Sequence, residues 1–353
     1  MLARPLYRFS KWCITLAVGG VITLSPFRLL AQTASSPPTT AGDRPCVELS
    51  GADYSSHNQT VKRLVDLYQT ASYTKLEDAL GCLMRTSHKF STGQPGSSAV
   101  YWMFRRLMPA PGMDARQPEL VSAWRKAFPN STMVEFAELR LRYAHAWNTR
   151  GGEVAGMTAE SAMRSFRQQM VDAEVAMSRA SEELKQTPIW HNLLLAIVQD
   201  LPDGRLRTAD VFREAVSRWP AYYDFYDVAI TRFVPRWGGS WALVDAFINN
   251  VASQMLSSES DSMYARLYAG VLLAGTQPDE TMLRWDRMKE SLDALNSRFP
   301  DPGFGNLAAS LACHYNDAEY FNIALRRTRD FQLDASYWLR GADIRGCARA
   351  YAR

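Results

Sequence analysis

The spacing of apolar residues predicts helices along almost the whole chain from about Asn58 onward. In the clearest stretch, apolar positions recur every three or four residues, as on one face of an α-helix. The positions are Met163, Phe166, Met170, Ala173, Met177, Ala180 and Leu184. Similar spacing occurs at Val61–Tyr68, Leu76–Leu83, Leu243–Met255 and Trp285–Phe299. No stretch shows the strict alternation that indicates a β-strand, so we expect an all-α protein.

Proline, glycine and small polar residues indicate where the predicted helices begin and end. The pairs Thr187-Pro188 and Asp301-Pro302 place proline early in a helix, after a residue suited to be the N-cap. Gln117-Pro118 has the same arrangement of a polar residue and a proline. Thr132 followed by Glu135 predicts a capping box. The glycine pairs at 151–152 and 238–239 are expected to end helices.

An aromatic residue followed by proline separates predicted helices at Phe128-Pro129, Trp219-Pro220 and Phe299-Pro300. Because a residue before proline disfavours the α conformation, each pair predicts a break. The first two breaks are each followed by a helix and then by a Gly-Gly pair. Repeated helical hairpins stack to bury their apolar faces, so we expect a tetratricopeptide-like α-solenoid of antiparallel hairpins. A plain helical domain with three unrelated proline breaks is the alternative.

The first residues have the pattern of a secretory signal peptide. Arg4, Arg8 and Lys11 precede an apolar run over 13–24, which is shorter than the roughly 20 residues that cross a bilayer. We predict a signal peptide over 1–32, a flexible linker and N-terminal segment over 33–55, and a helical domain over 56–353 with a seam at 151–157. The protein is then periplasmic or secreted, without an integral membrane span once the signal is removed. A retained N-terminal anchor is the alternative.

Charge gives no support for a nucleic-acid partner. The formal charge of the whole chain is +4, and residues 1–32 contain four basic residues and no acidic one. Removing that segment therefore leaves a formally neutral protein. The basic balance belongs to the predicted signal peptide.

Four cysteines remain after the predicted signal peptide: Cys46, Cys82, Cys313 and Cys347. An even number of well-separated cysteines in an oxidising compartment predicts two disulfides. Of the three possible pairings, proximity in sequence favours Cys46–Cys82 with Cys313–Cys347, each stapling one end of the array. No Cys-x-x-Cys motif is present, so neither a redox motif nor a zinc site is indicated.

Several segments resemble a bacterial family known only as domain of unknown function 4034. The segments run from Pro220 to Tyr223, from Val234 to Ser240, and from Arg142 to Gly152. The resemblance extends over about residues 54–329 and is most specific from Pro235 to Ser240. It implies a tetratricopeptide-like helical fold. The family has no assigned activity, so the resemblance transfers no catalytic residue.

Residues suited to catalysis are sparse. The five histidines are scattered without metal-binding spacing, and no Gly-x-Ser-x-Gly motif exists. We therefore predict no metal and no cofactor. Asp224 and Asp227 lie among aromatic residues at helical spacing, which makes them the best candidates for an acid/base pair. An envelope hydrolase that uses this pair is the alternative function.

The densest aromatic cluster, from Trp219 to Trp241, is the predicted binding site. Aromatic residues and arginine are enriched at binding hot spots. The candidates for contact with a partner are Tyr222, Tyr223, Tyr226, Arg236, Trp237 and Trp241. The Gly238–Ser240 turn beside Arg232 and Arg236 is suited to hold a carboxylate or phosphate. The alternative is that Trp237 and Trp241 only pack between helices.

We expect an exported, non-enzymatic protein that binds a protein or peptide partner. An accessory or protective role in an envelope or secretion system is the specific form of this hypothesis. It is suggested by analogy with other exported repeat proteins and not by particular residues.

Overall fold

The computed structural model describes residues 56–85, 89–153, 155–201, 204–255, 257–328 and 337–351. These residues form an all-α protein with one isolated antiparallel bridge, between Lys89 and Pro95. The α-helices are α1 (His57–Gln69), α2 (Tyr73–Arg85), α3 (Gly96–Leu107), α4 (Gln117–Ala127), α5 (Thr132–Arg150), α6 (Glu160–Ser178), α7 (Glu182–Lys185), α8 (Pro188–Gln199), α9 (Gly204–Arg218), α10 (Asp224–Ile230), α11 (Trp241–Gln254), α12 (Ser257–Leu273), α13 (Trp285–Arg298), α14 (Pro302–His314), α15 (Ala318–Arg327) and α16 (Ile344–Tyr351). The predicted signal peptide and linker lie outside the described residues.

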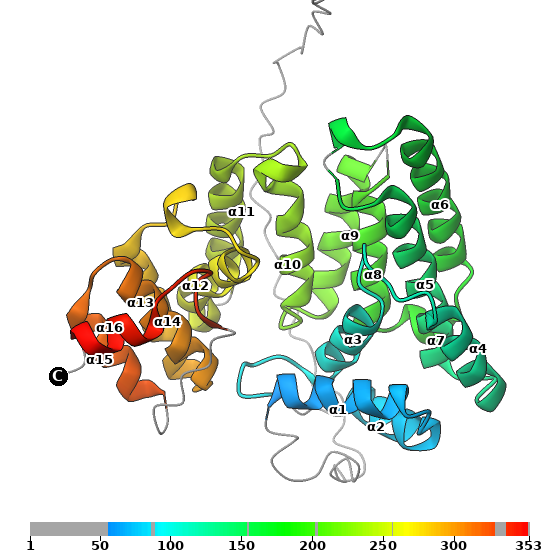
Figure 1. Ribbon diagram of the computed structural model, residues 1–353, viewed down its shortest axis with the longest axis horizontal. Coiled ribbons are helices and arrows are strands. Elements are labelled where there is room, and N and C mark those ends of the chain that lie inside the picture. Colours follow the sequence, from blue (N-terminus) through cyan, green and yellow to red (C-terminus); the bar gives the residue numbers. More distant parts are fainter. Residues whose placement is uncertain are drawn as a thin grey trace, which may run out of the picture. The chain divides into compact units, whose positions relative to one another are not determined.

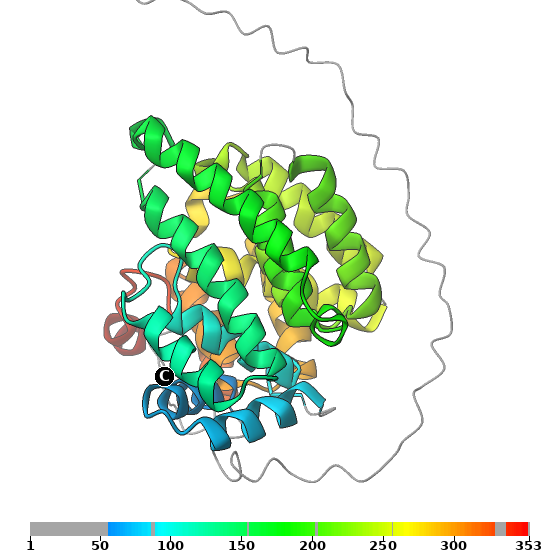
Figure 2. The ribbon, with the colours of Figure 1, turned by 90° about the vertical axis from the view of Figure 1, so that its right-hand side faces the viewer.

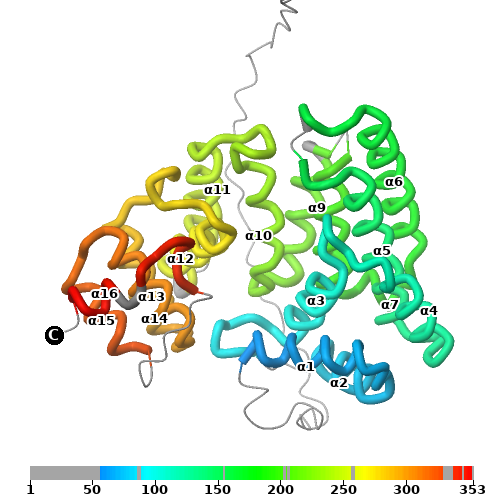
Figure 3. Tube along the Cα trace, in the orientation of Figure 1, coloured from blue at the N-terminus to red at the C-terminus, as the bar shows by residue number. Residues whose placement is uncertain are grey.

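Most helices pack against the next helix in the chain (Figure 1). This holds for α5 with α6, for α11 with α12, for α12 with α13, and for α14 with α15. Figure 2 shows α5 and α6 side by side, on either side of the predicted seam at 151–157. At the N-terminal end of the described chain, α1 and α2 pack against α3 (Figure 3). Contacts of α3 with α8, and of α10 with α12, join helices that are not consecutive.

The short helix α10 contributes side chains to two separate groups of buried residues. Tyr222, just before it, and Phe225 pack in one group with Leu195 of α8. Tyr223 and Tyr226 belong to a second group, which contains the apolar faces of α11 to α15. Because α10 lies between these groups, nearly all of its aromatic side chains are removed from solvent.

The three predicted aromatic–proline breaks are confirmed. The helices before them end at Ala127, Arg218 and Arg298. In each case the N–H of the aromatic residue donates to the carbonyl four residues earlier, at 2.9 Å for Phe128, 2.9 Å for Trp219 and 2.8 Å for Phe299. The following proline then prevents the helix from continuing.

Helix starts agree with the sequence except at α5. Thr187 and Asp301 cap α8 and α14 as predicted. The capping box predicted at Thr132 is wrong, because Ser131 is the N-cap of α5. The carboxylate of Glu135 instead accepts from the N–H and the hydroxyl of Ser181, at 2.8 and 2.6 Å. Glu135 therefore links α5 to the start of α7.

The long apolar stripe that starts at Met163 does not belong to one helix. The helix α6 ends at Ser178, and Ser181 caps a new short helix, α7, which carries the buried Leu184. The stripe continues across the break because the end of α6 and the helix α7 face the same core, whereas Met163, Phe166 and Met170 belong to another group of apolar side chains. The change of element is therefore not visible in the apolar spacing.

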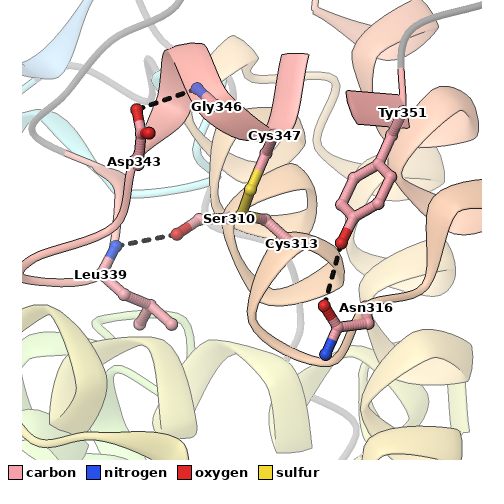
Figure 4. The surroundings of a disulfide bond; sticks show 8 residues. All are labelled: Ser310, Cys313, Asn316, Leu339, Asp343, Gly346, Cys347 and Tyr351. Carbon is pink, nitrogen blue, oxygen red and sulfur yellow. Dashed lines mark hydrogen bonds between the residues drawn. A yellow bond between two sulfur atoms is a disulfide. The ribbon is translucent and has the colours of Figure 1, made fainter. Parts of the chain in front are cut away.

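Cys313 of α14 and Cys347 of α16 form a disulfide bond, with Cα atoms 5.8 Å apart (Figure 4). Hydrogen bonds near it also hold the end of the chain against α14. Leu339 N–H donates to the Ser310 hydroxyl at 2.8 Å, and the Tyr351 hydroxyl donates to Asn316 at 2.9 Å. Cys46 lies outside the described residues, so its pairing with Cys82 stays a prediction.

None of the helices in the described ranges combines the length and apolar character that a bilayer crossing requires. The two longest, α5 and α6, have 19 residues each. Both carry charged side chains along their length.

Candidate functional site

The two Gly-Gly turns that resemble each other in sequence contact each other in the structure. The first follows α5, where Gly151 ends the helix with φ at 81°. The second follows a 3₁₀ turn, Pro235–Trp237, and begins with Gly238 at φ 84°. The Arg236 guanidinium donates to the Gly152 carbonyl at 3.1 Å. A repeat recognised along the chain is therefore also a contact in space.

Arg150, at the end of α5, lies at the centre of this contact. Its side chain is 6% exposed, and its guanidinium lies 5.0 Å from the ring of Trp147, 5.5 Å from that of Trp237 and 5.9 Å from that of Phe166. Burial lowers the pKa of Arg150. Arginine nevertheless stays charged at neutral pH, because its ordinary pKa lies above 12. The structure therefore holds a fixed cation among three aromatic rings, a favourable cation–π arrangement.

Asp200, the residue after α8, lies near this cation. Its carboxylate accepts from the Trp147 indole N–H at 3.0 Å and from the Tyr143 hydroxyl at 3.4 Å. Burial raises the pKa of Asp200 to about 7, and these hydrogen bonds, together with the charges of Arg232 and Arg150, oppose the rise. Near neutral pH the carboxyl group is therefore partly protonated, and the net charge around Arg150 depends on pH.

We name Trp147, Arg150, Asp200, Arg236 and Trp237 the tryptophan–arginine site. Trp237 is 36% exposed, and Arg236 is exposed as well. Two guanidinium groups and one partly protonated carboxyl group give this site an excess of positive charge. An exposed indole beside a cation is an arrangement typical of recognition sites.

The remaining predicted contact residues fall into two groups. Trp241 is half-buried at the start of α11, and the Ser240 hydroxyl accepts from Leu243 N–H as the N-cap of that helix. Tyr222, Tyr223 and Tyr226 are only 1%, 3% and 3% exposed. The three tyrosines are therefore core residues, because α10 lies between two groups of apolar side chains. Of the predicted contact residues, only Arg236, Trp237 and Trp241 reach the surface.

The predicted acid/base pair lies on the first turn of α10. Asp224 is 2% exposed, and its carboxylate accepts from the Trp102 indole N–H at 2.9 Å and from the Gln94 amide at 3.3 Å. Burial raises the pKa of Asp224. Burial, and then the neighbouring Asp224, raise the pKa of Asp227 to about 7. A substrate cannot reach Asp224 in this structure, so the carboxylate acts as an acceptor that ties α3 to α10.

Arg266 of α12 is a buried cation that sequence reasoning missed. Its guanidinium lies 3.9 Å from the ring of Tyr223 and 4.7 Å from that of Phe299, and it donates to the Thr92 carbonyl at 2.8 Å. Its charge also opposes the rise in the pKa of Asp227. These contacts give Arg266 a structural role, since they join α12 to the loop before α3.

Sequence reasoning also missed Trp147, Arg150 and Asp200. A signal for the first two was present, because Trp147 to Gly152 and Arg236 to Gly239 both combine a tryptophan, an arginine and a Gly-Gly pair, although in a different order. Asp200 carries no such signal. Its role depends on the packing of α5 near the end of α8.

Among the described residues, no cluster of three or more histidine, cysteine or acidic side chains could hold a metal ion. The histidines form other contacts. His191 is buried between the Thr187 carbonyl and Glu214, at 3.1 and 3.3 Å. His314 contacts Asp279 at 3.1 Å, rather than the acidic residues that follow it in sequence.

No family model, curated protein or solved structure matches the chain. The resemblance to the domain of unknown function 4034 family therefore stays a prediction from its residues.

Proposed function

We propose that this chain is a non-enzymatic binding protein that receives a segment of a protein or peptide partner at the tryptophan–arginine site. One observation carries the proposal: Arg150 is held among three rings, and one of them, Trp237, is 36% exposed beside the exposed Arg236. Fixed aromatic and arginine side chains lose little freedom on binding, which is why they dominate hot spots.

We also propose the wider architecture in which this site acts. The helices stack as a tetratricopeptide-like solenoid, and the pairs Cys46–Cys82 and Cys313–Cys347 staple its ends. Such arrays offer extended surfaces to partners. The pattern of residues 1–32 supports export to the periplasm or beyond, where the protein serves as an accessory or protective factor of an envelope or secretion system.

The alternative, a hydrolase that uses Asp224 and Asp227, has less support. Asp224 is buried at 2% exposure and receives hydrogen bonds from Trp102 and Gln94. A general acid must reach the substrate directly or through one water. The hydrolase would therefore need α3 and α10 to separate before catalysis.

Site-specific photocrosslinking tests the binding function. A photoreactive tryptophan analogue at position 237, which keeps the indole ring, is expected to capture a partner from the envelope fraction, and Arg236→Gln in the same chain should remove the adduct. The matched control places the same group at Met282, which is 53% exposed in the segment between α12 and α13. Equal adducts at both positions, or adducts that persist in Arg236→Gln, would contradict the proposal.

A further inference from the structure

The loop after α5 is held by two arginines from different parts of the chain. Arg150 donates to the carbonyls of Gly151 and Glu153, at 3.1 and 3.0 Å. Arg236 donates to the carbonyl between them, on Gly152, at 3.1 Å. Three consecutive carbonyls therefore accept from two guanidiniums, which places both cations at one short loop.

The charge of this pair is not balanced within the described chain. Arg236 lowers the pKa of Arg150, so the two cations repel each other. Asp200 attracts Arg150, but its hydrogen bonds come from Trp147 and Tyr143. In the described ranges, no carboxylate forms an ion pair with either arginine. An anion supplied from outside would relieve the repulsion.

We propose that the partner presents the carboxylate of an aspartate or glutamate side chain to the exposed Arg236, beside the buried charge of Arg150, with an adjoining apolar residue on Trp237. This inference rests on the binding function proposed above and names the chemistry of the partner. Arginine donates to carboxylates through a planar fork, often with two parallel hydrogen bonds. The exposed indole of Trp237, and the 50% exposed Leu243 in the first turn of α11, favour a peptide over a small free anion.

Two pools of short random peptides test the inference. The pools are identical except that asparagine and glutamine replace every aspartate and glutamate in the second. The full chain is expected to retain peptides from the acidic pool, enriched in an acidic residue next to an apolar one. Because a charge-assisted hydrogen bond is lost, Arg236→Gln should weaken retention by about tenfold or more.

The matched control is Arg179→Gln, which removes an exposed positive charge at the far end of α6. That helix rises by about 28 Å over its length. Retention by this variant should equal that of the unaltered chain. Arg236 and Arg179 are both exposed, and equal melting temperatures would show that neither change alters the fold.

Other outcomes separate the two proposals. Equal retention from both pools, lost in Trp237→Ala, would overturn the carboxylate inference and leave the binding function standing. Retention that neither Arg236→Gln nor Trp237→Ala changes would overturn both. A third outcome would be that inorganic phosphate displaces the acidic peptides, and that phosphopeptides bind more tightly than the acidic peptides. The ligand would then be a phosphate, and the carboxylate inference would fail.

Discussion

The indole rings of Trp147 and Trp237 meet edge to face, with centroids 5.6 Å apart and planes at 77°. Trp147 is 8% exposed and donates to Asp200, whereas Trp237 is 36% exposed and covers the outer side of the contact. Trp147 lies in the last turn of α5, four residues before Gly151, whereas Trp237 directly precedes Gly238. Trp147 forms the buried side of the site, and Trp237 forms its solvent-exposed side.

Replacing each tryptophan should separate packing from binding. Trp237→Ala removes a partly exposed ring, so we expect a loss of about 1–2 kcal/mol in the free energy of unfolding. The protein should stay folded and lose its partner. Trp147→Ala removes a buried ring and a donor to Asp200, and a loss of about 3–5 kcal/mol is expected. Denaturant titration measures both values, and unfolding of Trp237→Ala would show that its role is packing alone.

The Asp200 carboxyl should make stability depend on pH. Its folded-state pKa is raised from 3.8 to about 7, so the folded protein binds the proton more tightly than the unfolded chain. The stabilisation that comes from this tighter proton binding is fully present below about pH 4, and it is lost as pH rises through 7. Asp200→Asn should therefore stabilise the protein at pH 8 by about 1–3 kcal/mol, and much less at pH 5. Urea titrations at both pH values measure the difference, and an equal effect at both would refute it.

Binding of an acidic peptide should show a related pH dependence. As pH falls from 8 to 6, Asp200 gains a proton while the ligand carboxylate, with a pKa near 4, stays ionised. The positive charge of Arg150, Arg232 and Arg236 is then less compensated, so affinity should rise by a few-fold. Asp200→Asn should bind with nearly the same affinity at both values. Calorimetric titration provides the test, and a lower affinity at pH 6 than at pH 8 would contradict the prediction.

Isosteric changes at Asp224 and Asp227 should distinguish structure from catalysis. Asp224→Asn keeps an acceptor for Trp102 and Gln94, so stability should change by less than about 2 kcal/mol. Asp224→Ala leaves those two donors unpaired and should cost about 2–4 kcal/mol. Partner capture should survive in Asp224→Asn and in Asp227→Asn. Turnover of an envelope carbohydrate or peptide that both changes abolish would instead establish the hydrolase.

The disulfide should stabilise the end of the chain. Cys347→Ser removes a crosslink that spans 34 residues, and we expect a loss of about 2–4 kcal/mol in the free energy of unfolding. Mass measurement without reductant should find one additional free thiol in this variant. Hydrogen exchange should increase mainly in α14 to α16. A uniform increase throughout the chain would contradict a local role.

Local features were predictable from sequence because they depend on neighbours along the chain. Leu76, Ala79, Leu80 and Leu83 are all buried on one face of α2, as their spacing indicates. The aromatic–proline breaks follow from the steric effect of proline on the preceding residue. The error at Thr132 was a shift of one position, since serine and threonine are both good caps and Ser131 immediately precedes it.

The site was predicted only in part because its geometry depends on tertiary packing. The aromatic density from Trp219 to Trp241 indicated a special region, but density does not show which side chains face solvent. Tyr222, Tyr223 and Tyr226 are buried, whereas Trp237 is exposed on the turn. The contacts of Arg150 and Asp200 arise where α5 meets α8 and the second turn. The sequence pattern of a single helix does not predict such a contact between separate elements.

The position of α10 determines what happens when the chain is expressed as two separate fragments. The aromatic residues just before α10 and in its first turn alternate between two groups of buried side chains, with Tyr222 and Phe225 in one and Tyr223 and Tyr226 in the other. A fragment that ends before Trp219 lacks the rings that cover Leu195, and a fragment that starts there exposes those same rings to water. Separately expressed halves should therefore aggregate alone and become soluble only when produced together, as fragments that complement each other.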